Sequence, residues 1–284
     1  MCSLFEPLDR ALNITQYSKY NLSAWKIISQ YLIVQDMSIL MLTSKIFYEV
    51  FEKSEVMDVF KNLYISRYTP FKWNIKSLTL FNRNVNPFNF KKLSKYKQLE
   101  KLCFSTFSTK EVNLSNIQDC KSLTDLDIEF TKIKNFYYLE KLVNLKRINL
   151  FGTGLIVIPQ LKFCPFLEDL NISKNDIYDI SPLKECINLK TLVLSYCKNI
   201  QNDNFNDNIK HLKQLTNLNI SHTRLYNIIG LTDCLNIKII NLWMTIVRDL
   251  SSLENCIDLQ VVKCSRICNI NILTSKFDKI KIIY

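Results

Sequence analysis

Glycine is scarce in this sequence, with three glycines among 284 residues. A phosphate-binding loop needs several clustered glycines so that its backbone can approach the ligand. The segment Gly152-Thr153-Gly154 is a lone G-x-G, and Val157 stands where a third glycine would be needed. Histidine is rarer still, with two residues, which leaves little for a metal site or a catalytic triad. We therefore expect a protein that is not an enzyme and that needs no cofactor or metal.

Long hydrophobic runs are also missing. No stretch of eighteen apolar residues occurs, so we expect no membrane span. The first ten residues, MCSLFEPLDR, contain acidic side chains and no apolar core, so they do not resemble a secretory signal peptide. Ten cysteines would suit a disulfide-rich secreted protein, but such cross-links are needed mainly by much smaller domains. We expect a reducing compartment, the cytoplasm or the nucleus.

An internal repeat organises the chain from about residue 73 onward. From Leu167 the sequence reads LEDLNISKNDIYDISPLKECIN, with apolar residues at repeat positions 1, 4, 6, 11, 14 and 17. The same frame recurs along the chain at intervals of 22 to 26 residues. The repeat starts are Ile75, Leu99, Leu123, Leu145, Leu167, Leu189, Leu215, Ile237 and Leu259. The extra residues near Asn202–Asn208 are interpreted as a loop insertion.

This pattern resembles the leucine-rich repeat, LxxLxLxxNxI, over about residues 75–284, and the DISPL unit is most similar to the short SDS22/internalin-type class. The alternating segment L-x-x-L-x-L suits a short strand with one buried face. One unit cannot bury its own apolar side, whereas stacked neighbours can. The resemblance implies an α/β solenoid, a leucine-rich repeat arc with a parallel concave sheet.

Two further columns of the repeat are informative. Position nine has the family's ladder asparagine only at Asn175 and threonine in most other units. Five cysteines stand three residues before a repeat start, where Leu142 and Leu212 stand in other units: Cys120, Cys164, Cys186, Cys234 and Cys256. A position that accepts either cysteine or leucine is a core position, because free cysteine packs as a small hydrophobic residue. These cysteines are therefore interpreted as structural.

Residues before about 72 do not follow the repeat and have the apolar spacing of short amphipathic helices, with Asp36 as a predicted N-cap. From Trp25 to Phe47 they resemble an F-box, although Tyr20-Asn21 replaces the family's opening Leu-Pro and phenylalanine replaces its later tryptophan. The resemblance implies docking on the adaptor Skp1. The implied adaptor-facing residues are Ile28, Leu32, Met37 and Leu40. An alternative is that the helices only cap the repeats.

The chain is thus divided into 1–72, an F-box-like helical domain, and 73–284, a leucine-rich repeat domain of about nine repeats. Positions three, five, seven and eight of each unit are predicted to face outward on the concave sheet. The predicted target-binding residues there are Asp125, Asp127, Glu129, Arg147, Phe151, Tyr196, His222 and Trp243. Exposed aromatic residues on a rigid sheet are common anchors of protein interfaces. The alternative is that these rings only pack against each other across strands.

Net charge is +11 and is placed unevenly. Residues 73–110 hold eight basic residues against one acidic residue, a balance of +7, and residues 259–284 hold five against one, a balance of +4. No nucleic-acid-binding module is recognisable, so solvated surface charge is favoured over nucleic-acid binding.

Two functions stay open at this point. The first is the non-catalytic substrate-recognition subunit of an SCF-type E3 ubiquitin ligase, which binds Skp1 and a cullin complex on one side and an unknown protein target on the other. The second is an SDS22-like scaffold or regulator.

Overall fold

The computed structural model describes residues 76–81, 97–105, 111–274 and 280–284, all within the compact unit Lys72–Tyr284. The four predicted adaptor-facing residues lie outside the described residues: Ile28, Leu32, Met37 and Leu40. Among the helices that the structure describes, none has both the length and the apolar character that crossing a bilayer requires.

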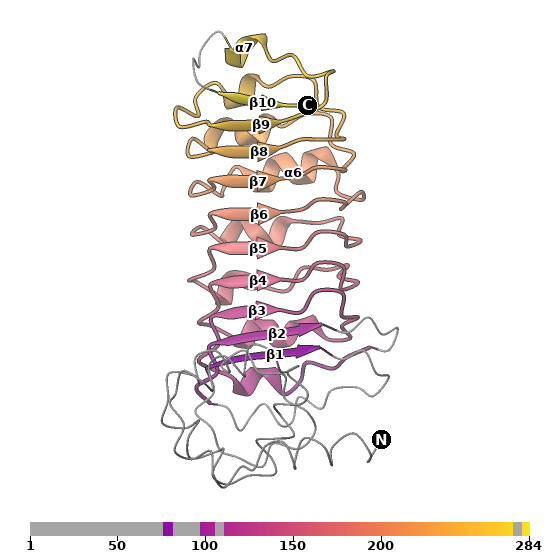
Figure 1. Cartoon of the computed structure of the whole chain (residues 1–284), viewed down its shortest axis with the longest axis vertical. Helices are drawn as coiled ribbons and strands as arrows, with labels where there is room; N and C mark the ends of the chain where they lie inside the picture. Colours follow the sequence, from indigo (N-terminus) through magenta and orange to yellow (C-terminus); the bar gives the residue numbers. More distant parts are fainter. Residues whose placement is uncertain (1–75, 82–96, 106–110, 275–279) are drawn as a thin grey trace, which may run out of the picture. The chain divides into compact units, whose positions relative to one another are not determined.

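The described strands form one ten-stranded sheet, in which each strand pairs in parallel with the next along the chain (Figure 1). The strands are β1 (Ser77–Phe81), β2 (Lys101–Ser105), β3 (Asp125–Asp127), β4 (Arg147–Asn149), β5 (Asp169–Asn171), β6 (Thr191–Val193), β7 (Asn217–Asn219), β8 (Ile239–Asn241), β9 (Val261–Lys263) and β10 (Lys281–Ile283). The predicted frame is confirmed, because Leu170 pairs with Leu192 and Leu192 with Leu218. Equivalent positions of neighbouring repeats are therefore paired along the sheet.

The core is built from the repeated apolar positions. In the unit that starts at Leu167 all six predicted core positions are at most 1% exposed: Leu167, Leu170, Ile172, Ile177, Ile180 and Leu183. Burial of each such side chain contributes about 2 to 3 kcal/mol relative to its exposed state. Because each unit contacts mainly its neighbours, this stabilisation accumulates along the stack.

Opposite the sheet, most units carry a short 3-10 helix (Figure 1). These are η4 (Ile117–Asp119), η5 (Phe136–Lys141), η6 (Leu161–Phe163), η7 (Ser181–Glu185), η8 (Ile229–Asp233) and η9 (Ser251–Leu253). A short α-helix, α7 (Asn271–Thr274), follows β9. Five of these 3-10 helices end at the column of the repeat cysteines, with Cys120, Leu142, Cys164, Cys186 and Cys234 as C-caps.

The cysteine column is confirmed as a core column. Its five members are at most 4% exposed: Cys120, Cys164, Cys186, Cys234 and Cys256. The Cys256 thiol lies 3.4 Å from the Cys234 carbonyl oxygen of the preceding unit, within reach of a weak S–H hydrogen bond. Burial raises the pKa of Cys186 and of Cys234 from 9.0 to about 12, so both thiols stay protonated at neutral pH.

Position nine is buried, and most of its threonines bond mainly within their own unit, although the Thr131 hydroxyl also lies 3.4 Å from the Phe104 carbonyl oxygen of the preceding unit. Each hydroxyl donates to the carbonyl oxygen three residues before it, at 2.6 to 3.0 Å, in Thr153, Thr223 and Thr245. Asn175 instead joins two units, because its amide nitrogen lies 2.8 Å from the Leu150 carbonyl oxygen and its side-chain oxygen accepts the Leu155 N–H at 2.9 Å. The threonines thus replace only part of what the asparagine does.

The predicted loop insertion near Asn202–Asn208 is wrong: this segment forms the helix α6 (Asn202–Ile209). Its buried residues share one helix face, with Phe205 and Ile209 both fully buried. Asparagines connect the helix to the units on either side. Asn204 accepts the Ile180 N–H at 2.8 Å, and Asn206 accepts the Gly230 N–H at 2.9 Å. These contacts with neighbouring units compensate for the weak helix propensity of an Asn- and Asp-rich segment.

Candidate protein-binding face

The outward side of the sheet follows the predicted alternation at the strands. In β3 and β5 the middle residue is buried, and the residues before and after it are partly exposed. At position seven the prediction of an outward side chain is wrong for the serines, because Ser173, Ser195 and Ser221 are at most 8% exposed. In these three units the side chain after the strand points inward, and the Ser195 hydroxyl lies 3.0 Å from the Ser173 hydroxyl.

The recurrent asparagines at position five have a structural role that the sequence did not indicate. In four units the side-chain oxygen of this residue accepts the backbone N–H two residues later, at 3.0 to 3.2 Å: Asn149, Asn171, Asn219 and Asn241. This local bond is an Asx-type turn, and it ends each three-residue strand. The asparagine column is thus explained by backbone geometry.

An acidic cluster lies at β3 and is partly neutralised by the next strand. The Arg147 guanidinium pairs with the Asp125 carboxylate, which raises the pKa of Arg147. The Asn149 amide nitrogen lies 3.1 Å from Asp127 and 3.4 Å from Glu129. Four of the predicted target-binding residues are therefore brought together, with Asn149 as a bridge that the prediction did not include.

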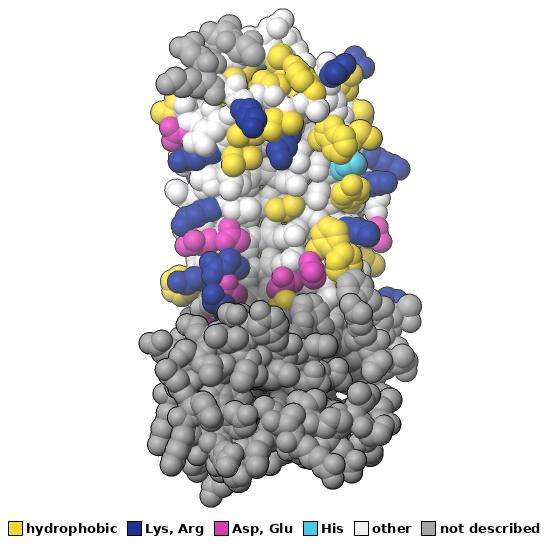
Figure 2. Space-filling view, viewed as in Figure 1, with side chains coloured by type: hydrophobic (Ala, Val, Ile, Leu, Met, Phe, Trp, Pro, Cys, Tyr) yellow, Lys and Arg dark blue, Asp and Glu magenta, His cyan; other side chains and the backbone are white. Residues whose placement is uncertain are grey.

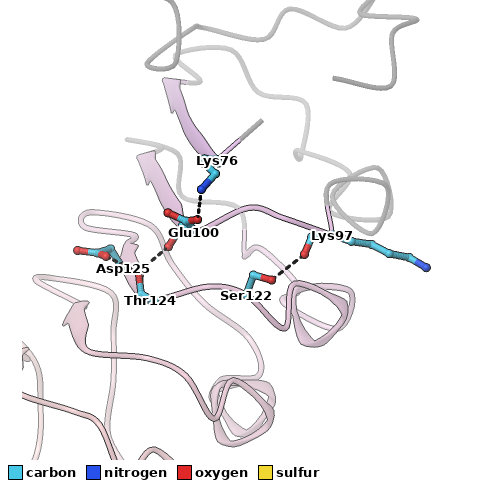
Figure 3. Close-up of polar contacts among 6 residues, drawn as sticks. All are labelled: Lys76, Lys97, Glu100, Ser122, Thr124 and Asp125. Atoms are coloured by element: carbon cyan, nitrogen blue, oxygen red, sulfur yellow. Dashed lines mark hydrogen bonds and ion pairs between the residues drawn. The ribbon is translucent and has the colours of Figure 1, made fainter. Parts of the chain in front are cut away.

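The first described units are linked by polar contacts at the start of their strands (Figure 3). The Lys76 ammonium pairs with the Glu100 carboxylate at 2.7 Å. The Thr124 hydroxyl lies 2.6 Å from the Asp125 carboxylate and 3.1 Å from the Glu100 carbonyl oxygen. The Thr124 contact helps to position the Asp125 carboxylate within the acidic cluster. Exposed pairs of this kind contribute at most about 1 kcal/mol each, so they position side chains more than they stabilise the fold.

Three predicted residues meet at the carboxyl ends of β6, β7 and β8. The Tyr196 ring stacks on the His222 ring, with centroids 4.1 Å apart and planes inclined by 10°. The Trp243 ring meets His222 edge to face at 5.2 Å. We call Tyr196, His222 and Trp243 the aromatic ledge. Tyr196 is 44% exposed and Trp243 is 47% exposed, so a partner can reach both rings.

A second aromatic contact lies two units before the ledge. The Phe130 and Phe151 rings pack edge to face with centroids 5.0 Å apart. The Lys174 ammonium lies 5.8 Å from the Phe130 ring and 5.9 Å from the Phe151 ring, within cation–π distance. In Figure 2 mainly hydrophobic and basic side chains, with a histidine and some acidic side chains, occupy the edge toward which the strand arrows of Figure 1 point.

Position eight has a left-handed backbone in six successive units. The φ angles lie between 51° and 62° at Phe130, Gly152, Lys174, Tyr196, His222 and Met244. Only glycine, and to a lesser degree asparagine and aspartate, adopts this conformation without strain. Sequence analysis missed this requirement, although Gly152 at the same position of its own unit was a signal for it. Met244, 56% exposed beside the ledge, was missed as a candidate for the same reason.

The described residues contain no cluster of three or more side chains suited to hold a metal ion. Cys103 is the half-buried thiol nearest the acidic cluster, and it pairs in register with Asp127. Burial, together with the charges of Asp127 and Glu129, raises the pKa of Cys103 to about 11. A protonated thiol is a poor nucleophile and a poor metal ligand.

Solved structures share this fold. Internalin C2 from Listeria monocytogenes is 24% identical, with a TM-score of 0.58 over 67% of this chain and 81% of that chain. The internalin inlF from the same organism is 19% identical, with a TM-score of 0.59 over 78% of this chain and 79% of that chain. The chain therefore has a leucine-rich repeat fold, as its repeat predicted. Neither the scan against family models nor the search of curated proteins gave a match.

A plant receptor has a similar structure. The leucine-rich repeat ectodomain of the Arabidopsis receptor kinase HAESA, in complex with an N-terminal extended IDA peptide hormone ligand, is 18% identical, with a TM-score of 0.52 over 69% of this chain. The match covers 36% of that ectodomain, so this chain spans about a third of its length.

Proposed function

We propose that this chain is a non-catalytic protein-interaction adaptor, and that it acts as the substrate-recognition subunit of an SCF-type E3 ubiquitin ligase. In this proposal residues 1–72 bind a Skp1-like adaptor, and through it the cullin complex, while the exposed sheet face of the repeats binds a protein target. The cytoplasm or the nucleus would be the compartment. The chemistry of ubiquitin transfer belongs to other subunits, and this chain contributes proximity.

The observation that carries the protein-binding part is the aromatic ledge. Tyrosine and tryptophan are enriched among the residues that dominate protein interfaces, and here they stand half exposed on the end of a rigid parallel sheet. The HAESA ectodomain, solved with a peptide hormone, supports the use of this fold for binding polypeptides. The adaptor part rests on the F-box-like pattern between Trp25 and Phe47, followed by the repeats.

A scaffold or regulator of the SDS22-like kind is the second candidate. The similarity to solved structures supports the leucine-rich repeat fold, which both candidates share. In this alternative residues 1–72 only cover the apolar end of the first unit.

Capture of purified Skp1 by the full chain separates the two candidates. We expect the chain to retain Skp1, and the double variant Leu32→Asp, Leu40→Asp to lose it, because two buried charges would disrupt an apolar interface. The control is Leu235→Asp, which changes a leucine of the repeat domain that is 50% exposed. Retention by the double variant would contradict the residue assignment, and no capture by the intact chain would favour the scaffold.

A further inference from the structure

We infer that the aromatic ledge is the anchor of the target site and that it accepts an aromatic side chain flanked by carboxylates in a protein segment. This inference rests on the proposed function, since it names the chemistry of the target that the sheet face would bind.

The first argument is backbone strain. His222 and Tyr196 have φ angles of 56° and 62°, a conformation that costs a residue with a Cβ atom about 1 kcal/mol or more. The fold requires only the backbone conformation at this position, and Gly152 provides it at the same position two units before Tyr196, without a side chain. Phe130, Lys174 and Met244 have the same backbone conformation, but only Tyr196 and His222 are neighbours in this column whose rings stack on each other. The turn itself does not require these two rings.

The second argument is preorganisation. The rings of the ledge already contact one another, with the Tyr196 and His222 planes nearly parallel and Trp243 perpendicular to His222. Rigid aromatic side chains lose little conformational entropy when a partner packs on them. An incoming aromatic ring can pack against Tyr196 or Trp243 without any rearrangement of the sheet.

The third argument is charge. Positions seven to ten of the three units that form the ledge contain Lys198 and Arg224 and no acidic residue. Both basic side chains are exposed, and each follows a ring of the ledge by two residues, which places its Cα atom at most about 7 Å away. Within the part of the chain that the structure describes, neither basic group takes part in an ion pair. Asp176, at position ten of the preceding unit, stands beside Lys198, so the local balance is two cations against one carboxylate. This net positive charge beside an apolar anchor complements carboxylates next to an aromatic side chain.

A single-stranded nucleic acid also combines rings with negative charge. Such a ligand needs a basic groove that follows its backbone over several nucleotides. The outward positions of β6, β7 and β8 hold no lysine or arginine: Thr191, Val193, Asn217, Asn219, Ile239 and Asn241. The sheet beside the ledge therefore provides no path for phosphates, and a protein segment is favoured.

The test uses the full chain and a fluorescein-labelled peptide, Ser-Glu-Asp-Phe-Glu-Asp-Ser, measured by fluorescence anisotropy. One control peptide has lysine at the four acidic positions, and the other has alanine in place of phenylalanine. We expect the acidic phenylalanine peptide to bind at least about tenfold more tightly than either control, in line with the loss of one interface anchor. Trp243→Ala should weaken its binding by a similar factor, whereas Tyr226→Ala, which removes a ring that is 58% exposed outside the ledge, should not.

Two further variants separate recognition from folding. Lys198→Glu combined with Arg224→Glu should shift the preference toward the lysine peptide, and Lys184→Glu, an exposed lysine of η7, should not. Tyr196→Asn relieves the strained backbone, so it should weaken peptide binding while the midpoint of urea unfolding stays level or rises.

Equal binding of the three peptides, absence of binding, or tighter binding of a twelve-nucleotide oligouridine would overturn the inference. A clear loss of stability in Tyr196→Asn would also overturn it, because the rings would then serve the fold. A chain that still captures Skp1 but ignores the acidic peptide would lose this inference and keep the proposed function.

Discussion

The unit that starts at Leu189 has the same strand arrangement as its neighbours on the sheet side, and it differs from them on the opposite, helical side. On the sheet side β6 pairs with β5 and β7 in the same register as every other described pair of neighbouring strands. On the other side an eight-residue α-helix replaces the 3-10 helices of three to six residues. The comparison teaches that strand register is fixed by the stack, whereas the opposite side accepts extra residues if their apolar groups and polar bonds find partners.

The largest effect is expected from removal of the helix's core residue. Phe205 is fully buried, so Phe205→Ala should lower the free energy of unfolding by about 3 to 5 kcal/mol. Leu183→Ala in η7 should cost a comparable amount, since Leu183 occupies the same repeat position in the preceding unit and is 1% exposed. Urea unfolding of the full chain measures both, with Tyr226→Ala as an exposed control. A loss below about 1 kcal/mol for Phe205→Ala would mean that the helix contributes little to the core.

The contact between α6 and the next unit should be almost as sensitive. A Cβ atom on Gly230 would lie 2.4 Å from the Asn206 carbonyl oxygen and 2.6 Å from its Cα atom, and backbone cannot move away easily. Gly230→Ala should therefore destabilise by about 2 to 3 kcal/mol. Gly154→Ala is the matched control, because nothing lies within 4 Å of its added Cβ and only its φ of +78° is strained. Equal thermal shifts for the two variants would contradict this packing.

A smaller effect is expected for the asparagines of the helix. Asn206→Ala removes the acceptor of the Gly230 N–H and the partner of the Asn227 side chain, at 2.9 and 2.6 Å. The loss of stability should be about 1 kcal/mol, the usual contribution of a hydrogen bond, because the Gly230 N–H is only partly buried. Asn199→Ala, an exposed asparagine just before the helix, is the control. Amide hydrogen exchange at Gly230 should accelerate in the first variant and not in the second.

The smallest effect at neutral pH is expected for the cysteine column, in which the unit with α6 has Leu212 where its neighbours have Cys186 and Cys234. The pKa of these two thiols is about 12 in the folded chain and near 9 when unfolded. The stability that this provides is complete below pH 9 and is lost as pH rises toward 12. The double variant Cys186→Val, Cys234→Val should lose less stability between pH 8 and pH 11 than the parent. An identical loss would show that other groups cause it.

The same comparison shows which features the sequence could predict. The repeat frame fixed the strands, their order and the core, because the hydrophobic pattern alone requires each unit to stack on the next. The helix α6 was missed because NDNFNDNI has weak helix propensity, and its formation depends on contacts with η7 and η8 that no local pattern contains. Contacts between neighbouring units therefore decide whether this segment is helical.

The candidate face was predicted in part. The sequence indicated the rings and, as an alternative to target binding, their packing against each other across strands, which the structure shows for Tyr196, His222 and Trp243. The inward turn of the serines at position seven and the left-handed backbone at position eight were missed, because both follow from how the chain leaves a three-residue strand. A repeat pattern gives positions, whereas side-chain direction after the strand depends on backbone angles. Whether the face binds a target stays a prediction.

The parallel register of the sheet has a geometric consequence. Each unit advances the chain by one inter-strand step of about 4.8 Å, so any two patches on the face are separated by a whole number of such steps. Four steps, about 19 Å, lie between the strand of Asp125 and the strand that precedes His222. Insertion or deletion of one complete unit between two patches would change their separation by one inter-strand step of about 4.8 Å. The spacing within each patch would stay the same.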